Sequence, residues 1–233
     1  MHLLNKEFDR VVCINLAERK DKKEAMQKSF GRLGIDVEWF NPVRYEFLPN
    51  IVNSINASGK AQFNPKQPFE IGASLSHYHV IKKALIDGVK KLFVFEDDAK
   101  FHKDFNNKLD NYWGYVPVDW DMISFYSFMY QLLPQNIRVS KRWMTSYKSW
   151  SLIAYGMNVK AMTEYIRKQD EYFGIADMVT FQMQETGKFN MYSAVPALCI
   201  PETDLKSDIR GMQMNYKNTP TVTNVGYSEE NYE

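Results

Sequence analysis

The sequence predicts an α/β protein with a mixed, mostly parallel sheet that helices cover on both faces. Short apolar runs typical of buried strands alternate with segments of helical periodicity over most of the chain. One of these runs, residues 91–95, ends in three consecutive carboxylates at 96–98. Ligands of such sheets bind outside the carboxyl ends of the strands, so this position is the first candidate for a functional site.

Composition and charge are those of a globular protein without a strong electrostatic preference. The chain has 233 residues, of which 45% are hydrophobic and 24% charged, and its formal net charge is +1. This balance argues against a global basic field for nucleic acid. No stretch approaches the roughly 18 apolar residues of a membrane span, and residues 1–10 lack the apolar core of a secretory signal. Cys13 and Cys199 lie in apolar segments, which favours buried free thiols and a cytoplasmic protein.

The first part of the chain predicts three strands and two helices. Strands are expected at 10–16, 37–40 and 91–95. The first helix has an apolar stripe and a glycine stop, formed by Met26, Phe30, Leu33 and Gly34. The second helix, over 71–87, has the stripe Ile71, Leu75, Tyr78, Ile81 and Leu85 and ends at Gly88. Residues 41–69 show little periodicity and predict a long loop.

The second part continues the alternation. Strands are expected at 121–126, 150–157 and 189–195, with helices at 102–113, 158–167 and 177–186. Asn158 is the expected N-cap of its helix, and residues 127–148 look irregular. From Gly211 the chain is polar and nonperiodic, which predicts a mobile tail. We therefore expect one domain over 1–210 and a polar tail over 211–233.

The three carboxylates after residue 95 indicate a metal site. In an extended strand Glu96 and Asp98 point to one face and Asp97 to the other. Adjacent carboxylates repel one another and resist leaving water, and a hard cation such as Mg²⁺ or Mn²⁺ removes the difficulty. The pattern predicts Glu96 and Asp98 as metal ligands. The alternative is an acidic loop that caps the next helix.

Other common nucleotide and metal motifs are absent from the sequence. It contains no Gly-rich phosphate loop, no dinucleotide fingerprint and no Cys/His cluster with zinc spacing. The acidic pair on an α/β sheet then leaves two interpretations, a metal-bridged nucleotide or a metal-dependent hydrolase.

Five segments share the order of motifs of a known family. They are Val12-Cys13-Ile14-Asn15-Leu16 with Arg19, Glu70-Ile71-Gly72-Ala73-Ser74-Leu75-Ser76-His77, Val94-Phe95-Glu96-Asp97-Asp98, Ala154-Tyr155-Gly156-Met157 running into Ala161, and Val195-Pro196 through Ser207-Asp208-Ile209. In these segments the chain resembles glycosyltransferase family 25, which contains lipopolysaccharide galactosyltransferases and collagen-modifying galactosyltransferases. The resemblance covers roughly residues 10–210.

The resemblance implies a GT-A fold that binds a nucleotide sugar with a metal on the acidic motif. A UDP-hexose donor, galactose or glucose, Mn²⁺ or Mg²⁺ as the metal and inversion at the sugar are the implied chemistry. The physical need is plain, since a metal on Glu96 and Asp98 can neutralise the charge of the leaving diphosphate. Donor contacts are expected from Asn15, Leu16, Arg19, Gly72, Asp97 and Asp208.

Two residues in the matched region are candidates for catalysis, His77 and Asp177. An inverting transfer needs a base for the proton of the acceptor hydroxyl, and Asp177 is the preferred candidate. The alternative for Asp177 is an N-cap of the helix that it begins. His77 is either a structural histidine, a donor contact or a group that supports the metal ligands. Asp208 either binds on the diphosphate side or closes a turn.

The acceptor is the least constrained part of the prediction. A glycan of the lipopolysaccharide type is expected first, and a viral enzyme that modifies a protein or a hydroxylated DNA base is the alternative. Aromatic and basic residues are expected to line its groove or to pack a loop on the core: Tyr126, Tyr130, Arg138, Lys141, Arg142 and Trp143. Rival functions are a nucleotidyltransferase and a degenerate transferase that binds sugar nucleotides without turnover.

Overall fold

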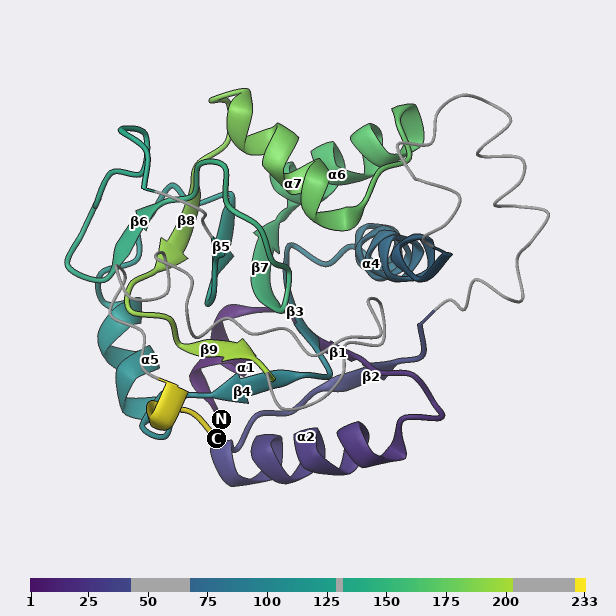
Figure 1. Cartoon of the computed structure of the whole chain (residues 1–233), viewed down its shortest axis with the longest axis vertical. Helices are drawn as coiled ribbons and strands as arrows, with labels where there is room; N and C mark the ends of the chain where they lie inside the picture. Colours follow the sequence, from purple (N-terminus) through teal and green to yellow (C-terminus); the bar gives the residue numbers. More distant parts are fainter. Residues whose placement is uncertain (43–67, 129–131, 203–228) are drawn as a thin grey trace.

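A mixed seven-stranded sheet forms the centre of the fold (Figure 1). The structure is a computed structural model that describes residues 1–42, 68–128, 132–202 and 229–233. The strands follow the order β2-β1-β3-β7-β5-β8-β6. Their bounds in that order are Glu38–Phe40, Arg10–Ile14, Lys91–Glu96, Ala154–Asn158, Met122–Ser124, Met191–Ala194 and Trp143–Thr145.

Five of these seven strands run in the same direction, in agreement with the predicted mixed, mostly parallel sheet. β1 pairs in parallel with β2 and β3, and β5 pairs in parallel with β8. β7 is antiparallel to both β3 and β5, and β6 is antiparallel to β8. The carboxyl ends of β1, β3, β5 and β8 therefore share one edge of the sheet. This architecture is consistent with a GT-A-type fold.

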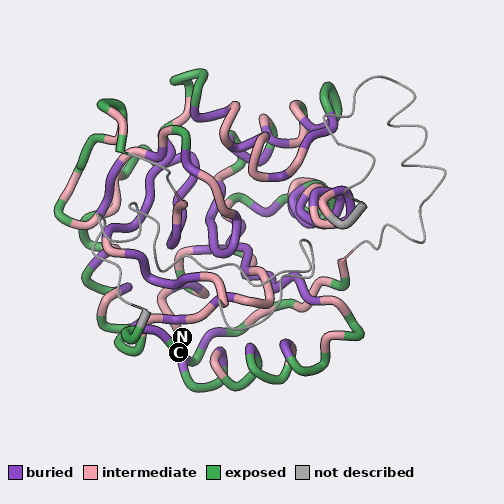
Figure 2. The backbone as a smooth tube through the Cα atoms, viewed as in Figure 1, coloured by how far each residue is buried: buried purple, intermediate pink, exposed green. Residues whose placement is uncertain are grey.

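Alternation along the strands builds two cores, one on each face of the sheet (Figure 2). Cys13 and Phe95 belong to the core beneath α1, α2 and α5, whereas their neighbours Ile14 and Val94 belong to the core beneath α4, α6 and α7. The helices span Leu3–Glu7 (α1), Lys20–Leu33 (α2), Pro68–Ile86 (α4), Phe105–Trp113 (α5), Val159–Glu171 (α6) and Ala176–Glu185 (α7).

The predicted ends of two helices are confirmed. Gly34 follows α2 with a left-handed φ of 74°, and its N–H donates to the carbonyl of Phe30. The side chain of Asn158 accepts a hydrogen bond from the N–H of Ala161 at 3.0 Å, which caps α6 as expected. Both termini follow from local sequence, because glycine and asparagine satisfy the backbone groups that a helix end leaves without partners.

A second, two-stranded sheet was not predicted. β4 (Ala99–Phe101) pairs antiparallel with β9 (Cys199–Pro201). The short helix α1 and the short strand β6 were also missed. Strands of three residues are too short to show a period, and the partners of β4 and β9 are about a hundred positions apart. The long loop expected at 41–69 falls mainly outside the described residues.

The prediction of a mobile tail is wrong for residues 229–233. Phe101 and Glu233 exchange two backbone hydrogen bonds of 2.9 Å, so the C-terminus extends the ladder beside β4. Tyr232 is buried, and its hydroxyl donates to the carbonyl of Ala197 at 2.8 Å. A short 3-10 helix, Glu229–Asn231, precedes it. The buried ring anchors the chain end, which polar composition alone did not reveal.

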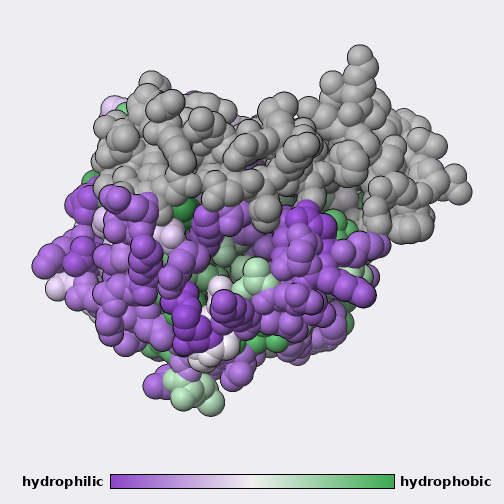
Figure 3. Space-filling view, turned by 60° about the horizontal axis from the view of Figure 1, so that its bottom comes forward, coloured by the Kyte–Doolittle hydropathy of each residue, from purple (hydrophilic) through white to green (hydrophobic). Residues whose placement is uncertain are grey.

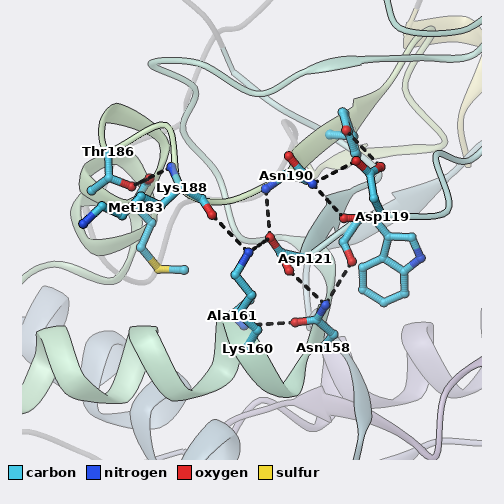
Figure 4. A network of polar contacts seen from close by, with 11 residues as sticks. Asp119, Asp121, Asn158, Lys160, Ala161, Met183, Thr186, Lys188 and Asn190 are labelled. Atoms are coloured by element: carbon cyan, nitrogen blue, oxygen red, sulfur yellow. Dashed lines mark hydrogen bonds and ion pairs between the residues drawn. The ribbon is translucent and has the colours of Figure 1, made fainter.

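The edge of the sheet opposite the acidic motif is held by a polar network around Asp121 (Figure 4). The buried carboxylate of Asp121 accepts hydrogen bonds from Asn158 Nδ2 at 3.1 Å, Lys160 Nζ at 2.7 Å and the N–H of Asn190 at 2.9 Å. Lys160 also donates to the carbonyl of Lys188 at 3.0 Å. These contacts join the start of α6 to the segment that leads into β8.

The surface of the described residues is mainly polar on the face that Figure 3 presents. Hydrophobic atoms show there only in small areas between hydrophilic residues (Figure 3). Among the helices of the described ranges, none combines the length and apolar character that crossing a bilayer would require.

The buried ring of Tyr232 makes the C-terminus part of the stable fold. We expect Tyr232→Ala to destabilise the protein by about 3 kcal/mol, because a large buried aromatic is lost, which lowers the melting temperature by about 6–12 °C. Tyr172→Ala is the matched control, since Tyr172 is 52% exposed. Differential scanning calorimetry gives both values. Equal melting temperatures for the two variants would contradict the anchoring role.

Candidate active site

The three carboxylates lie where β3 ends at the carboxyl edge of the sheet. Glu96 is the last residue of β3, and Asp97 and Asp98 form the turn that leads into β4. The expectation of one extended strand through Asp98, with alternating faces, is therefore wrong, because the chain turns after Glu96. Each carboxylate instead meets a different environment.

Glu96 is held by a buried histidine from α4. His77 Nε2 lies 2.9 Å from Glu96 Oε1, and His77 Nδ1 lies 2.9 Å from the hydroxyl of Tyr155 on β7. His77 and Tyr155 are both buried. Both ring nitrogens of His77 are thus engaged within the protein. These contacts favour the prediction that His77 supports a ligand over a role as a mobile base.

Asp97 turns toward the end of β1 and the start of α2. Its Oδ2 accepts a hydrogen bond from Asn15 Nδ2 at 2.8 Å, and its Oδ1 lies 3.1 Å from Lys22 Nζ. Burial raises the pKa of Asp97, and Lys22 and Asn15 oppose that shift. Lys22 was not predicted, because a lysine in the first turn of a helix normally lies in solvent. Its side chain is only 5% exposed.

Asp98 differs from its two neighbours in its hydrogen bonding. Within the described residues its Oδ1 is buried without a hydrogen-bond partner. Burial, followed by the charge of Glu96, raises the pKa of Asp98 to about 7. The backbone of Asp98 is fixed, since its carbonyl accepts from the N–H of Glu202 at 2.7 Å. A buried carboxylate oxygen next to a second carboxylate fits a divalent cation.

Glu96 and Asp98 are the pair that could hold such a cation. Across the described ranges, no group of three or more His, Cys, Asp or Glu side chains has the arrangement of a metal centre. Mg²⁺ is commonly bound by one or two carboxylates, with substrate phosphates and water as the other ligands. A protein pair is therefore compatible with a site that is completed by a diphosphate.

Asp177 reaches the same edge of the sheet from α7. Its Oδ2 accepts a hydrogen bond from the N–H of Ser151 at 3.3 Å. Two residues further along, the carbonyl of Ile153 accepts from the N–H of Glu96 at 2.8 Å. Two residues span at most about 7 Å, so Asp177 lies close to the acidic motif. Burial raises the pKa of Tyr155 well above its ordinary value, and neighbouring charges, Asp177 among them, add to this shift.

Comparisons with known proteins agree with this architecture. The sequence model described as Glycosyltransferase family 25 (LPS biosynthesis protein) matches residues 8–174. This chain belongs to glycosyltransferase family 25. Human procollagen galactosyltransferase 2 is 29% identical over 133 residues, which cover 50% of this chain and 20% of that protein. Procollagen galactosyltransferase 1-B of Xenopus laevis is 30% identical over 127 residues, covering 50% and 21%.

Another relative shows that membership of the family does not by itself establish catalysis. Human inactive glycosyltransferase 25 family member 3 is 29% identical over 128 residues, covering 50% of this chain and 21% of that protein. The chain spans about a fifth of the length of these curated relatives. The residues at the sheet edge must therefore carry the functional argument for this family member.

The predicted donor contacts lie in different surroundings. Asn15 is buried, and its Nδ2 also donates to the carbonyl of Arg19 at 3.2 Å. The Arg19 guanidinium pairs with both oxygens of Asp21, at 3.0 and 2.9 Å, and this pairing lowers the pKa of Asp21 to about 2. The carbonyl of Leu16 accepts from the N–H of Arg19 at 2.9 Å. Gly72 is buried in α4, and Asp208 lies outside the described residues.

The alternative that Asp177 caps its helix is wrong. Ile175 is the N-cap residue of α7, and Asp177 lies in the first turn, where its carboxylate contacts Ser151 instead. Of the residues expected to line an acceptor groove, Tyr126 and Trp143 are buried, and Arg142 donates to Asn111 at 2.9 Å. Trp143 therefore packs in the core. Arg138 and Lys141 are exposed, and Tyr130 lies outside the described residues.

The raised pKa of Asp98 predicts that Asp98→Asn stabilises the folded protein, and that this gain in stability depends on pH. Below about pH 4 this carboxyl is protonated in both folded and unfolded protein. Between pH 4 and its folded pKa of about 7, the folded state binds more protons, so wild-type stability falls as the pH rises. Without divalent cation, we expect Asp98→Asn to melt above the wild type at pH 8 and to lose most of that advantage at pH 5.

The same melting experiment tests whether Asp98 binds a divalent cation. Mn²⁺ should raise the melting temperature of the wild type at pH 8 and leave that of Asp98→Asn unchanged, since binding to the folded state stabilises it. Asp110→Asn is the matched control, because Asp110 is exposed, and it should behave as the wild type. A shift of equal size in Asp98→Asn would contradict a metal role for Asp98.

Proposed function

We propose that this chain is a metal-dependent glycosyltransferase that moves a hexose from a UDP-sugar to an acceptor hydroxyl with inversion. The observation that carries the proposal is the buried Oδ1 of Asp98, which has no hydrogen-bond partner among the described residues and lies beside Glu96 at the end of a central strand. A fold gains nothing in stability from an uncompensated buried carboxylate. Family membership supplies the reaction class in which such a pair has a use.

Glu96 and Asp98 are the residues that would hold a divalent cation, Mn²⁺ or Mg²⁺. When bound, the cation would neutralise the negative charge that develops on the departing diphosphate. Asp97 differs from its two neighbours, because Lys22 and Asn15 already compensate its charge. Asp97 therefore orients the turn. A donor that contacts this carboxylate would meet it already paired with Lys22.

The residues around Glu96 fix its carboxylate in one orientation. If His77 carries its proton on Nε2, that nitrogen donates to Glu96 Oε1, and Nδ1 accepts from the hydroxyl of Tyr155. This chain of hydrogen bonds links α4, β3 and β7. Partners of this kind orient metal ligands, and their loss commonly reduces metal affinity by about 10–100-fold.

Asp177 is the better candidate for the base that takes the proton of the acceptor hydroxyl. Both nitrogens of His77 are occupied and buried, whereas Asp177 Oδ2 holds a 3.3 Å hydrogen bond to a backbone N–H. A base must lie within hydrogen-bond reach of the proton that it removes. Asp177 also lies on α7, apart from the carboxylates assigned to the cation.

The names of the relatives favour particular substrates. Two relatives are named procollagen galactosyltransferases, and this name supports galactose ahead of glucose as the sugar. The description of the family as an LPS biosynthesis protein supports a glycan acceptor, and the procollagen enzymes keep a protein acceptor as the alternative. A degenerate binder without turnover is the second candidate, favoured by the relative that is named inactive.

A panel of nucleotide sugars with and without Mn²⁺ tests the function directly. We expect a UDP-hexose to raise the melting temperature only when Mn²⁺ is present, and release of UDP to require an acceptor. Excess chelator should abolish the release. Stabilisation without any UDP release across a glycan array would favour the degenerate binder, and full turnover in chelator would exclude the metal.

The base assignment predicts that Asp177→Asn reduces transfer at least about a hundredfold, within the range of general-base contributions. Asparagine keeps an oxygen that can accept from the N–H of Ser151, so the local fold and the affinity for UDP should remain. Steady-state transfer and isothermal titration calorimetry measure the two quantities. Wild-type transfer in this variant would place the base elsewhere.

The donor site predicts that Arg19→Ala weakens UDP binding by about 1.5–3 kcal/mol, the usual contribution of a charged hydrogen bond. The Arg19–Asp21 pair is partly exposed, with Asp21 61% accessible, and such surface pairs are weak enough for a diphosphate to displace. Arg167→Ala is the matched control on the outer surface of α6. Unchanged UDP affinity in Arg19→Ala, measured by calorimetry with Mn²⁺ present, would remove Arg19 from the donor site.

A further inference from the structure

Segment 149–151 is fastened to one face of α7. The N–H of Ser149 donates to Gln184 Oε1 at 2.9 Å, and Gln184 Nε2 donates back to the carbonyl of Ser149 at 3.1 Å. The N–H of Ser151 donates to Asp177 at 3.3 Å. Asp177 and Gln184 lie seven residues apart, which is two turns along the same face of a helix.

An aromatic pair lies between these two polar attachments. The rings of Trp150 and Phe181 have centroids 4.8 Å apart and an interplanar angle of 38°. Phe181 is four residues after Asp177, so it shares the face of α7 that carries the proposed base. Both aromatic residues are partly accessible to solvent. Trp143 differs, because it is fully buried and its Nε1 donates to the carbonyl of Tyr112.

The backbone around Trp150 is strained, and its surroundings enforce the strain. Lys148 has φ 50° and Ser151 has φ 92°, and within the described ranges they are the two non-glycine residues with positive φ. Such conformations cost of order 1–3 kcal/mol each and cluster at ligand sites. Trp150 itself is locked by two backbone hydrogen bonds with Phe128, of 2.9 and 2.8 Å.

The aromatic pair is close to the acidic motif. Trp150 precedes Ile153 by three residues, which span at most about 11 Å, and the carbonyl of Ile153 accepts the N–H of Glu96. Trp150 is also adjacent in sequence to Ser151, which contacts Asp177. The pair therefore lies beside the proposed base.

We propose that Trp150 and Phe181 bind the pyranose ring of the acceptor and present its hydroxyl to Asp177. This inference rests on the proposed function and adds the acceptor class to it. One face of a pyranose consists of C–H groups that pack on a flat aromatic ring, while polar groups at the rim bind its hydroxyls. The carboxylate of Asp177, on the same face of α7, supplies such a polar group, and the buried Ser149–Gln184 pair holds the segment that carries Trp150 in place.

The test uses the full chain with saturating UDP and Mn²⁺ and a panel of methyl hexopyranosides as probes. Saturation-transfer NMR should detect at least one methyl hexopyranoside on the wild type. Trp150→Ala should weaken its binding at least about tenfold, whereas Trp150→Phe should retain most of it because a flat ring remains. Tyr115→Ala, which removes an exposed aromatic at 41% accessibility, should leave the binding unchanged.

Three results would overturn the inference. The first is that the wild type binds no methyl hexopyranoside, and the second is that Trp150→Ala binds it as the wild type does. The third is that Trp150→Ala weakens the binding of UDP instead, which would place the ring of Trp150 against uracil. Calorimetry of UDP on the wild type separates these results from failure of the proposed function, because absence of UDP binding would contradict the donor site alone.

Discussion

Three consecutive carboxylates at the end of a buried strand set the constraint that the rest of this edge of the sheet satisfies. Carboxylates this close repel one another and cannot all be buried without compensation. The fold separates them by turning after Glu96, so that each side chain lies in different surroundings. Glu96 contacts His77 from α4, and Asp97 contacts Lys22 from α2. Asp98 keeps an oxygen without a partner among the described residues.

This solution depends on contacts between distant parts of the chain. The parallel pairing of β1 with β3 places Asn15 beside Asp97, 82 positions away in sequence. The antiparallel pairing of β3 with β7 sets Val94 opposite Tyr155, whose hydroxyl reaches His77. The register of the central strands therefore determines the geometry of the site, and a one-residue slip in either pair would turn these side chains to the wrong face.

Local patterns allowed the sequence to predict the larger elements and the place of the carboxylates at the end of β3, but not the contacts that these carboxylates make. Helical stripes, glycine stops and apolar runs are all signals within a short stretch of sequence, so α2, α4 and the strands β1 and β3 were predictable. Lys22 was missed because nothing local distinguishes a buried lysine from a solvated one. The ladder of β4 with β9 and the docking of Tyr232 were missed because pairings across about a hundred residues leave no local periodicity.

A comparison of Asp121 with Asp98 bears on the role proposed for Asp98. Asp121 accepts hydrogen bonds from three donors at the edge of the sheet opposite the site, which is how a fold retains a buried charge for stability. Asp98 has a folded pKa of about 7, with burial as the first cause. Groups whose pKa values are raised by burial and a neighbouring charge cluster at functional sites. Within the described part of the chain, Asp121 has three donors and Asp98 Oδ1 has none, and this contrast supports the metal role proposed for Asp98.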